Sequence, residues 1–325
     1  MAYKTYEREK SPLHGFEYER KIYQEAYENG LEVTSLGTCA DYIPELAKSD
    51  PDAFGLCVAL PDGTFLEYGD CSTRFSVQSI SKVINLCAAL KFRGFRDVFS
   101  HVLMEPSGDS FNSIIKLDTV NKLPYNPMIN AGAIQTVSLL VQDGFTFEDL
   151  LGFARKMCSD PDISLNEAVF KSEAATGDRN RAIAYLLKSK GVLMAEPLPT
   201  LDLYFRLCSL NVNARSLAGL GLTLACNGTD PVTGRHYLHP GYVRTVKSIM
   251  FSCGLYDASG QFAVKVGLPA KSGVGGGLVC ASEGPRGFGC YGPALDRYGN
   301  TVAGVAAMEH ISHCLGLHVF DSEWD

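Results

Sequence analysis

The sequence predicts an α/β protein in which one sheet is built from both ends of the chain and a helical domain is inserted between them. Two observations predict this arrangement. Short extended segments lie at 53–69 and again after residue 260, whereas helical periodicity dominates from 97 to 228. The 325 residues, of which 46% are hydrophobic and 20% charged, suit a globular chain of about two domains. We therefore assign 1–96 and 229–325 to the sheet domain and 97–228 to the helical domain, and we expect a ligand cleft between them.

The first predicted element is a β-hairpin near the start of the chain. Residues 53–60 form a short apolar run, 61–63 (Pro-Asp-Gly) supply a turn, and 64–69 read as the returning strand. From 76 to 91 the pattern changes, because apolar residues now recur at steps of three and four. That spacing predicts a helix with one buried face.

Helical patterns continue through the middle of the chain, and extended patterns return after a turn-rich stretch at 229–240. The predicted helices are 131–142, 146–158, 163–170, 178–190, 200–209, 213–226 and 241–252. The later segments are predicted as strands at 262–267, 277–282, 287–291 and 301–308, followed by a closing helix at 309–317. The economical arrangement is a single sheet that combines these late strands with the early hairpin.

Charge and cysteine usage exclude several classes of protein. There are 29 Lys and Arg against 36 Asp and Glu, so the net charge is −7, and nucleic acid or an anionic membrane is not an expected partner. No apolar run is long enough to span a membrane, and the charged first ten residues show no signal-peptide pattern. The 11 cysteines are scattered without a CxxC pair, which favours reduced thiols. We therefore expect a cytoplasmic protein.

Ser79 and Lys82 form the first candidate catalytic pair. On a helix, residues three apart share a face one turn apart, so the two side chains are expected to point the same way. A desolvated, partly neutral lysine can take the proton of a serine hydroxyl, and the Ser-x-x-Lys spacing occurs in serine acyl-transfer enzymes. The alternative is a chance match, since this spacing arises in many helices.

A Lys-Ser-Gly triplet at 271–273 favours the same chemistry. It is followed by Val274 and three glycines, which would let the backbone approach a substrate closely. Serine acyl-transfer enzymes carry such a triplet on a strand beside the nucleophile, and a backbone N–H here could complete an oxyanion hole with that of Ser79. The alternatives are a flexible turn or a phosphate loop, and the latter is disfavoured because no Gly-Lys-Ser/Thr follows.

Two polar loops supply candidate groups for binding an amino acid. They lie at 126–133 and 172–180 and contribute Asn130, Glu173 and Asn180. One carboxylate and two amides can hold an α-amino group and an α-carboxylate at once. The alternative is ordinary capping and turn chemistry.

A metal site is not expected. His310, His313 and Cys314 lie close together in the sequence, but spacing fixes no third ligand and the segment reads as a helix. We therefore predict neither a metal nor another cofactor.

Taken in order, four motifs resemble those of the serine-dependent glutaminases. They lie at 75–82, 126–133, 172–180 and 270–277, and the resemblance extends from about residue 42 to 304. It implies a β-lactamase- or penicillin-binding-protein-like fold, which is a mainly antiparallel sheet flanked by helices with an inserted helical domain. It also implies hydrolysis of L-glutamine to L-glutamate and ammonia without a cofactor. The length resembles the bacterial form, for which a homo-oligomer, either a dimer or a tetramer, is expected.

The resemblance also implies a role for individual positions. Ser79 matches the nucleophile, Lys82 its partner, and Tyr256 the tyrosine that exchanges protons with the serine. The backbone N–H groups of Ser79 and Val274 match the oxyanion hole. The implied substrate contacts are Tyr42, Gln78, Ser79, Asn130, Glu173, Asn180, Tyr204, Tyr256 and Val274.

The implied reaction passes through an acyl-enzyme. Ser79 attacks the side-chain amide carbon, either Lys82 or Tyr256 takes its proton, and water then hydrolyses the ester. Two other functions would use the same parts. A penicillin-recognising hydrolase or peptidase would normally act outside the cytosol and carry a Ser-x-Asn element, which is not evident here. A non-catalytic sensor of glutamine or a β-lactam is disfavoured by the intact Ser79, Lys82 and Tyr256 set.

Overall fold

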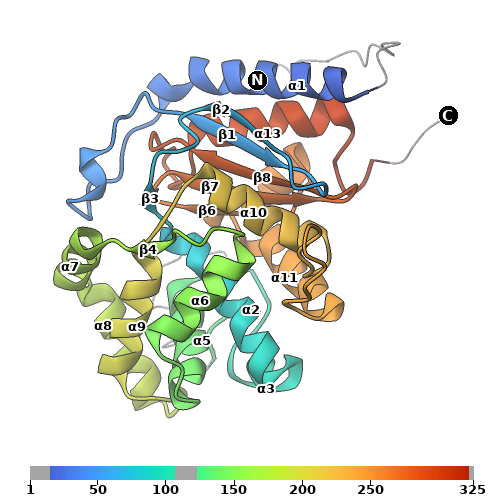
Figure 1. The fold of residues 1–325 in the computed structure, drawn as a ribbon. Coiled ribbons are helices and arrows are strands. Elements are labelled where there is room, and N and C mark those ends of the chain that lie inside the picture. Colours follow the sequence, from blue (N-terminus) through green and yellow to red (C-terminus); the bar gives the residue numbers. More distant parts are fainter. Residues whose placement is uncertain (1–14, 107–122, 322–325) are drawn as a thin grey trace.

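The computed structural model describes residues 15–106 and 123–321, and a five-stranded antiparallel sheet lies at its centre (Figure 1). The strand order is β2-β1-β8-β7-β6. The strands are β1 (Gly55–Ala59), β2 (Phe65–Gly69), β6 (Ala270–Gly273), β7 (Gly277–Ser282) and β8 (Arg286–Tyr291). Because β1 pairs with β8, the early hairpin and the late strands form one sheet, which confirms the prediction.

Helices cover both faces of this sheet (Figure 1). On one face, α1 (Phe16–Glu32) packs along α13 (Val302–Leu315), and α10 (Ala214–Ala225) covers the other face. Helix α10 falls within 97–228, the stretch that we assigned to the helical domain, yet it packs mainly on β8, β7 and β1. The structure thus shows that both ends of the chain contribute strands to the sheet, whereas the domain boundaries remain a prediction.

The strands divide their side chains between two apolar cores. In β1, Leu56 and Val58 join the core beneath α1 and α13, whereas Cys57 and Ala59 join the core on the side of α10. This alternation follows from the two-residue period of a strand. All five residues of β1 are buried because helices cover both faces.

Two glycines of β8 let α10 approach the sheet closely. A Cβ at Gly287 would lie 2.1 Å from the carbonyl oxygen of Ala218, and one at Gly289 would lie 2.0 Å from that of Ala214. Atoms cannot come so close, so any larger residue must push the helix away. The helix backbone therefore rests directly on the strand.

Most of the remaining helices lie together on one side of the sheet, beyond α10 (Figure 1). They are α2 (Ser81–Arg93), α3 (Phe95–His101), α5 (Asn130–Gln142), α6 (Phe147–Met157), α7 (Glu167–Thr176), α8 (Asp178–Ser189), α9 (Pro197–Cys208) and α11 (Pro240–Cys253). A small sheet of β3 (Phe75–Ser76), β5 (Leu210–Val212) and β4 (Ser164–Leu165) joins this part to the rest. The helices predicted at 131–142, 146–158, 178–190, 200–209, 213–226 and 241–252 are confirmed to within three residues at each end. The helix predicted at 76–91 begins five residues later, and the segment predicted at 163–170 contains β4 before α7, which ends six residues further along the chain.

The predicted strand at 262–267 is wrong, because the chain forms α12 (Ser259–Lys265) there. Phe262 and Val266, four residues apart, are buried on one side of this turn, whereas Val264 between them is 72% exposed. Valines are common in strands, but tertiary packing of the helical face prevails here.

The predicted strand at 301–308 is also wrong. Thr301 caps α13 by accepting a hydrogen bond from the N–H of Gly304, and the helix then continues through the predicted closing helix. Ala303, Ala307 and Ile311 are buried at four-residue steps against α1 and the sheet. Small residues allow this close packing of two helices.

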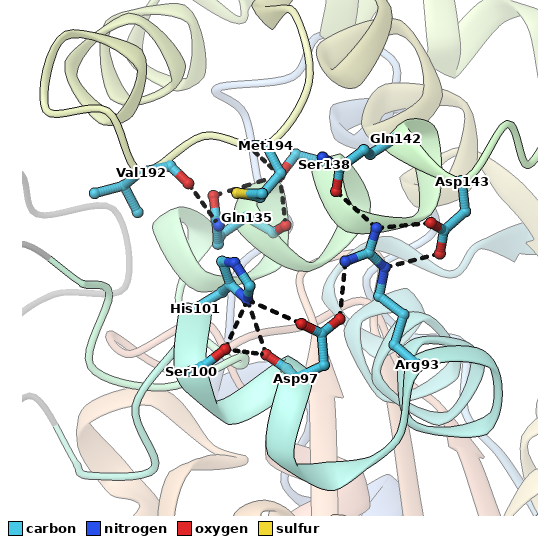
Figure 2. A network of polar contacts seen from close by, with 10 residues as sticks. All are labelled: Arg93, Asp97, Ser100, His101, Gln135, Ser138, Gln142, Asp143, Val192 and Met194. Carbon is cyan, nitrogen blue, oxygen red and sulfur yellow. Dashed lines mark hydrogen bonds and ion pairs between the residues drawn. The ribbon is translucent and has the colours of Figure 1, made fainter.

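A polar network fixes the end of α2 within the helical part (Figure 2). The Arg93 guanidinium donates to both carboxylate oxygens of Asp143 at 2.7 Å and to Gln142 at 2.7 Å, both at the end of α5. It also donates to Asp97 of α3 at 2.8 Å. One side chain thus holds three helices, and two of these, α2 and α5, begin at the site described below.

A second contact in Figure 2 fixes α5 to the loop that follows α8. Gln135 donates to the carbonyl of Val192 at 2.8 Å, and the Ser138 hydroxyl accepts from the N–H of Met194 at 3.3 Å.

No helix in the described residues combines the length and apolar character needed to cross a membrane.

We predict that Gly289→Ala destabilises the protein by about 1–3 kcal/mol, since the added methyl group meets the backbone of α10. The matched control is Gly152→Ala on α6, where a Cβ would meet nothing within 4 Å. The control should stabilise the protein by about 0.5–1 kcal/mol, because alanine favours helix. Urea unfolding of both variants checks this. Equal stabilities for the two variants would contradict the packing described here.

Candidate active site

Ser79 lies in a strained turn between a strand and a helix. The turn is the 3-10 helix η3 (Gln78–Ile80), which leads from β3 into α2. Gln78 has a φ of 48°, in the left-handed region that is costly for residues other than glycine. Ile80 is fully buried, whereas Ser79 is partly exposed. The turn therefore presents the Ser79 hydroxyl outward on a firmly anchored backbone.

Lys82 follows one turn later and is almost fully buried, with 1% of its surface exposed. Its Nζ donates to Asn130 Oδ1 at 2.7 Å and to the carbonyl of Met128 at 3.2 Å. Burial lowers the pKa of Lys82 to about 8, although the nearby groups of Cys208 and Glu173 oppose this change. A substantial fraction of this amine is therefore neutral near pH 8.

Tyr256 lies in the segment that follows α11. It begins the 3-10 helix η4 (Tyr256–Ala258) and has a φ of 53°, again in the left-handed region. Its hydroxyl lies 3.4 Å from the carbonyl oxygen of Ser272. Burial raises the pKa of Tyr256 to about 12, although the nearby Ser79 and Ser272 act to lower it, so the phenol is protonated at neutral pH.

The Lys-Ser-Gly triplet lies on β6 itself, rather than in a flexible turn. Lys271 is fully buried, and its Nζ donates to the carbonyls of Gly254 at 2.8 Å and Ser272 at 2.7 Å. The same Nζ lies 4.2 Å from the centre of the Tyr256 ring. Burial, followed by the charge of Lys82, holds the pKa of Lys271 well below its usual value.

A cavity of about 110 Å³ opens beside Ser79, which suits a small ligand rather than a drug-sized one. The cavity is lined by Tyr42, Ile43, Gln78, Ser79, Asn130, Glu173, Thr176, Gly177, Arg179, Asn180, Tyr204 and Cys208. Seven of the predicted substrate contacts are among these residues. The structure thus brings together loops and helices that are far apart in the sequence.

Glu173 supplies a carboxylate to this cavity from α7 and is 6% exposed. Burial raises its pKa to about 7, while a hydrogen bond from Gln78 at 3.4 Å and the charge of Lys82 oppose this rise. On the same cavity, Asn130 Nδ2 donates to Asn180 Oδ1 at 2.9 Å. A carboxylate and two amides therefore converge on one small space.

Val274 lies just after β6 and packs against Tyr256, Ile43 and Leu295 in a small apolar cluster. Among the described residues, the backbone N–H of Val274 and that of Ser79 donate to no other protein group. Both N–H groups are thus available to a ligand.

Sequence reasoning missed Cys208 as a member of the cavity wall. Its position four residues after Tyr204 on a helix is the signal that would have found it. The histidines weighed as metal ligands lie on α13, where His310 is 3.4 Å from Glu25. Within 15–106 and 123–321, no group of three or more His, Cys, Asp or Glu is placed to hold a metal ion.

The comparisons with known sequences point to one family. The family model described as Glutaminase matches residues 37–320. A curated relative, the glutaminase of Clostridioides difficile (strain 630), is 47% identical over 304 residues, which are 92% of this chain and 98% of that protein.

Solved structures agree with this result. The structure described as "Probable glutaminase ybaS" matches with a TM-score of 0.87 and 36% identity, covering 93% of this chain and 99% of that chain. The Bacillus subtilis glutaminase YbgJ, in covalent complex with 5-oxo-L-norleucine after reaction with 6-diazo-5-oxo-L-norleucine, matches with a TM-score of 0.84 and 35% identity, covering 93% and 99%. These likenesses confirm the predicted β-lactamase-like fold, with an antiparallel sheet flanked by helices.

Proposed function

The chain belongs to the glutaminase family and hydrolyses the side-chain amide of L-glutamine to L-glutamate and ammonia, and we propose that Ser79 is the nucleophile of an acyl-enzyme mechanism. The observation that carries this proposal is the position of Ser79 in the cavity wall, one turn before the buried Lys82 and near Tyr256. The relative YbgJ supports it, because its ligand is bonded to the protein and keeps a carbonyl at the carbon that corresponds to the amide carbon of glutamine.

The first step transfers the hydroxyl proton of Ser79 as its oxygen attacks the amide carbon. We assign the base to Lys82, since its pKa of about 8 leaves part of the amine neutral near physiological pH. Tyr256, whose pKa is raised to about 12, remains protonated and can donate to the departing ammonia. Lys82 and Tyr256, which the sequence left as alternative bases, are thus assigned as the base and the acid of this step.

The negative charge that develops on the carbonyl oxygen during the attack must be stabilised by hydrogen-bond donors that are already in position. The N–H groups of Ser79 and Val274 are available for this, and each such donor is worth about 3 kcal/mol in comparable sites. After ammonia leaves, Lys82 passes the proton it took from Ser79 to the Tyr256 phenolate, so Lys82 is neutral again. Water then attacks the ester carbon while Lys82 takes a proton from it, the ester bond breaks, and Tyr256 protonates the departing Ser79 oxygen. A last transfer from Lys82 to Tyr256 restores both groups.

The other end of glutamine carries an ammonium and a carboxylate. Among the residues that the structure describes, Glu173 is the one carboxylate that lines the cavity, so we assign it to the α-ammonium group. The amides of Asn130 and Asn180 are assigned to the α-carboxylate, and Tyr42, Gln78 and Tyr204, which also line the cavity, are assigned as further substrate contacts. Holding both ends directs the side-chain amide of the substrate toward Ser79.

We further propose that the protein works in the cytoplasm as a homo-oligomer. The scattered cysteines and the acidic net charge of −7 support a reducing compartment without a nucleic-acid or membrane partner. All 11 cysteines are free thiols in the structure.

We predict that Ser79→Ala lowers turnover by about three orders of magnitude or more, because the covalent route is lost while packing is kept. Ammonia release measures turnover, and calorimetry measures whether glutamine still binds. Ser100→Ala, an exposed serine on α3, is the control and should keep normal turnover. If Ser79→Ala retains turnover within about tenfold of the unchanged enzyme, another residue is the nucleophile.

Turnover should rise with pH. Lys82 must be neutral to accept a proton, and its lowered pKa of about 8 means that the neutral fraction grows as pH increases from about 6 to about 9. We therefore expect kcat at saturating glutamine to rise over this range with an apparent pKa near 8, with folding checked at each pH. A flat or falling profile would remove Lys82 from the role of base.

We predict that Glu173→Gln raises the KM for glutamine by about ten- to a hundredfold, the worth of one charge-assisted hydrogen bond. Because burial raises the pKa of Glu173 to about 7, the carboxyl is protonated below that pH and the ammonium group loses its partner. KM of the unchanged enzyme should therefore rise as pH falls below 7, and the variant should lose this dependence. A variant with the original KM would leave Glu173 as a structural residue of α7.

A further inference from the structure

Asn300 is a buried polar residue that the reaction proposed above does not use. It is 1% exposed, and it does not line the substrate cavity. It ends a tight turn at 296–300, in which its N–H donates to Asp296 Oδ1 at 3.0 Å and its carbonyl accepts from the N–H of Asp296 at 2.8 Å. A buried amide is costly unless it is hydrogen-bonded, so the partners of its side chain indicate what it does.

The side chain of Asn300 joins two segments that meet at Tyr256. Its Oδ1 accepts from the hydroxyl of Ser272, on β6, at 2.6 Å. Its Nδ2 lies 3.5 Å from the carbonyl oxygen of Leu255, the residue directly before Tyr256. One amide thus connects the turn at 296–300 both to the strand beside the site and to the backbone that carries the phenol.

Ser272 in turn contacts the segment of Tyr256 at two points. Its carbonyl oxygen lies 3.4 Å from the Tyr256 hydroxyl and also accepts from the Nζ of Lys271 at 2.7 Å. Its N–H donates to the carbonyl of Gly254 at 3.3 Å. By holding Ser272, Asn300 therefore fixes the acceptor of the phenol hydroxyl as well as the backbone that precedes the ring.

Tyr256 needs such support because of its backbone conformation. Its φ of 53° lies in the left-handed region, which persists only where the surrounding structure imposes it. The turn at 296–300 also packs on the ring itself, since a Cβ at Gly299 would lie 3.7 Å from Cε2 of Tyr256 and 3.3 Å from Cγ1 of Val274. The turn that holds Asn300 thus rests on both the proposed acid and a proposed oxyanion donor.

We propose that Asn300 is a positioning residue for glutamine hydrolysis, which holds the Tyr256 hydroxyl where it can protonate the departing ammonia. This proposal rests on the assignment of Tyr256 as the acid. It predicts an effect on the chemical step rather than on substrate binding, because neither Asn300 nor its partners Ser272 and Leu255 line the cavity.

The test measures kcat and KM for Asn300→Ala, Tyr256→Phe and the double variant. We expect Asn300→Ala to lower kcat by about ten- to a hundredfold, because a small displacement of a reacting group is enough for a loss of this size. KM should change by less than about threefold. We expect the double variant to resemble Tyr256→Phe alone, since Asn300 acts through the phenol that is already lost.

Asn213→Ala is the matched control. Asn213 is also a buried asparagine, and it caps α10 by accepting from the N–H of Ser216 at 2.8 Å. It does not line the cavity, so its loss should lower stability and leave kcat and KM unchanged.

A second variant covers the case in which Asn300→Ala does not fold. Ser272→Ala removes the 2.6 Å hydrogen bond to Asn300 and leaves the carbonyl of residue 272 in place. It should lower kcat by about three- to tenfold with little change in KM, and the loss should again disappear in the Tyr256→Phe background.

Three results overturn the proposal. If Asn300→Ala keeps the original kcat, the amide positions nothing that the reaction needs. If it lowers kcat equally with and without the Tyr256 hydroxyl, it acts through general packing and not through the phenol. If Tyr256→Phe leaves kcat unchanged, the assignment of Tyr256 as the acid is wrong, and the role of Asn300 falls with it. None of these results bears on Ser79, whose role is tested by Ser79→Ala.

Discussion

Lys82 places an amine in the protein interior, where the loss of hydration disfavours its charged form. Two oxygen acceptors, from Asn130 and Met128, compensate part of this cost without supplying a full negative charge. The pKa of Lys82, about 8, results from these two opposing effects. Activation of the serine hydroxyl depends on this lowered pKa, because only the neutral amine can accept a proton. Both acceptors belong to the segment that leads into α5, so the position of α5 against α2 decides the chemistry.

The rest of the fold holds these two helices and the reacting groups in place. Arg93 joins the far ends of α2 and α5, while β6 supports the opposite side of the site through Lys271 and Tyr256. Gln78 and Tyr256 both have left-handed backbone conformations, which only a surrounding structure can impose at a cost of about 1–3 kcal/mol each. The contact of α10 with the glycines of β8 supplies part of that surrounding rigidity.

The sequence predicted local spacing well and long-range contacts poorly. The three-residue step from Ser79 to Lys82 predicted that both lie one helical turn apart, and they do lie at the junction of η3 and α2. The prediction that both ends of the chain contribute strands to one sheet was also confirmed. The strands at 262–267 and 301–308 were wrong because the residues buried there, Phe262 and Val266 in one and Ala303 and Ala307 in the other, are four positions apart, as on one face of a helix. The bond from Lys82 to Asn130 spans 48 positions in the sequence, so no local pattern could reveal it. The same holds for Cys208, which meets Ser81 only in the folded chain.

The central claim is that a partly neutral Lys82 activates Ser79 at neutral pH. It can be tested directly with 6-diazo-5-oxo-L-norleucine, the compound that reacts with the relative YbgJ. Peptide mapping by mass spectrometry after timed exposure would give both the labelled residue and the rate of labelling. The account predicts a label on Ser79, a rate that rises with pH around an apparent pKa near 8, and a large loss of rate in Lys82→Met. A label on another residue, or a rate on Ser79 that is unaffected by Lys82→Met, would contradict it.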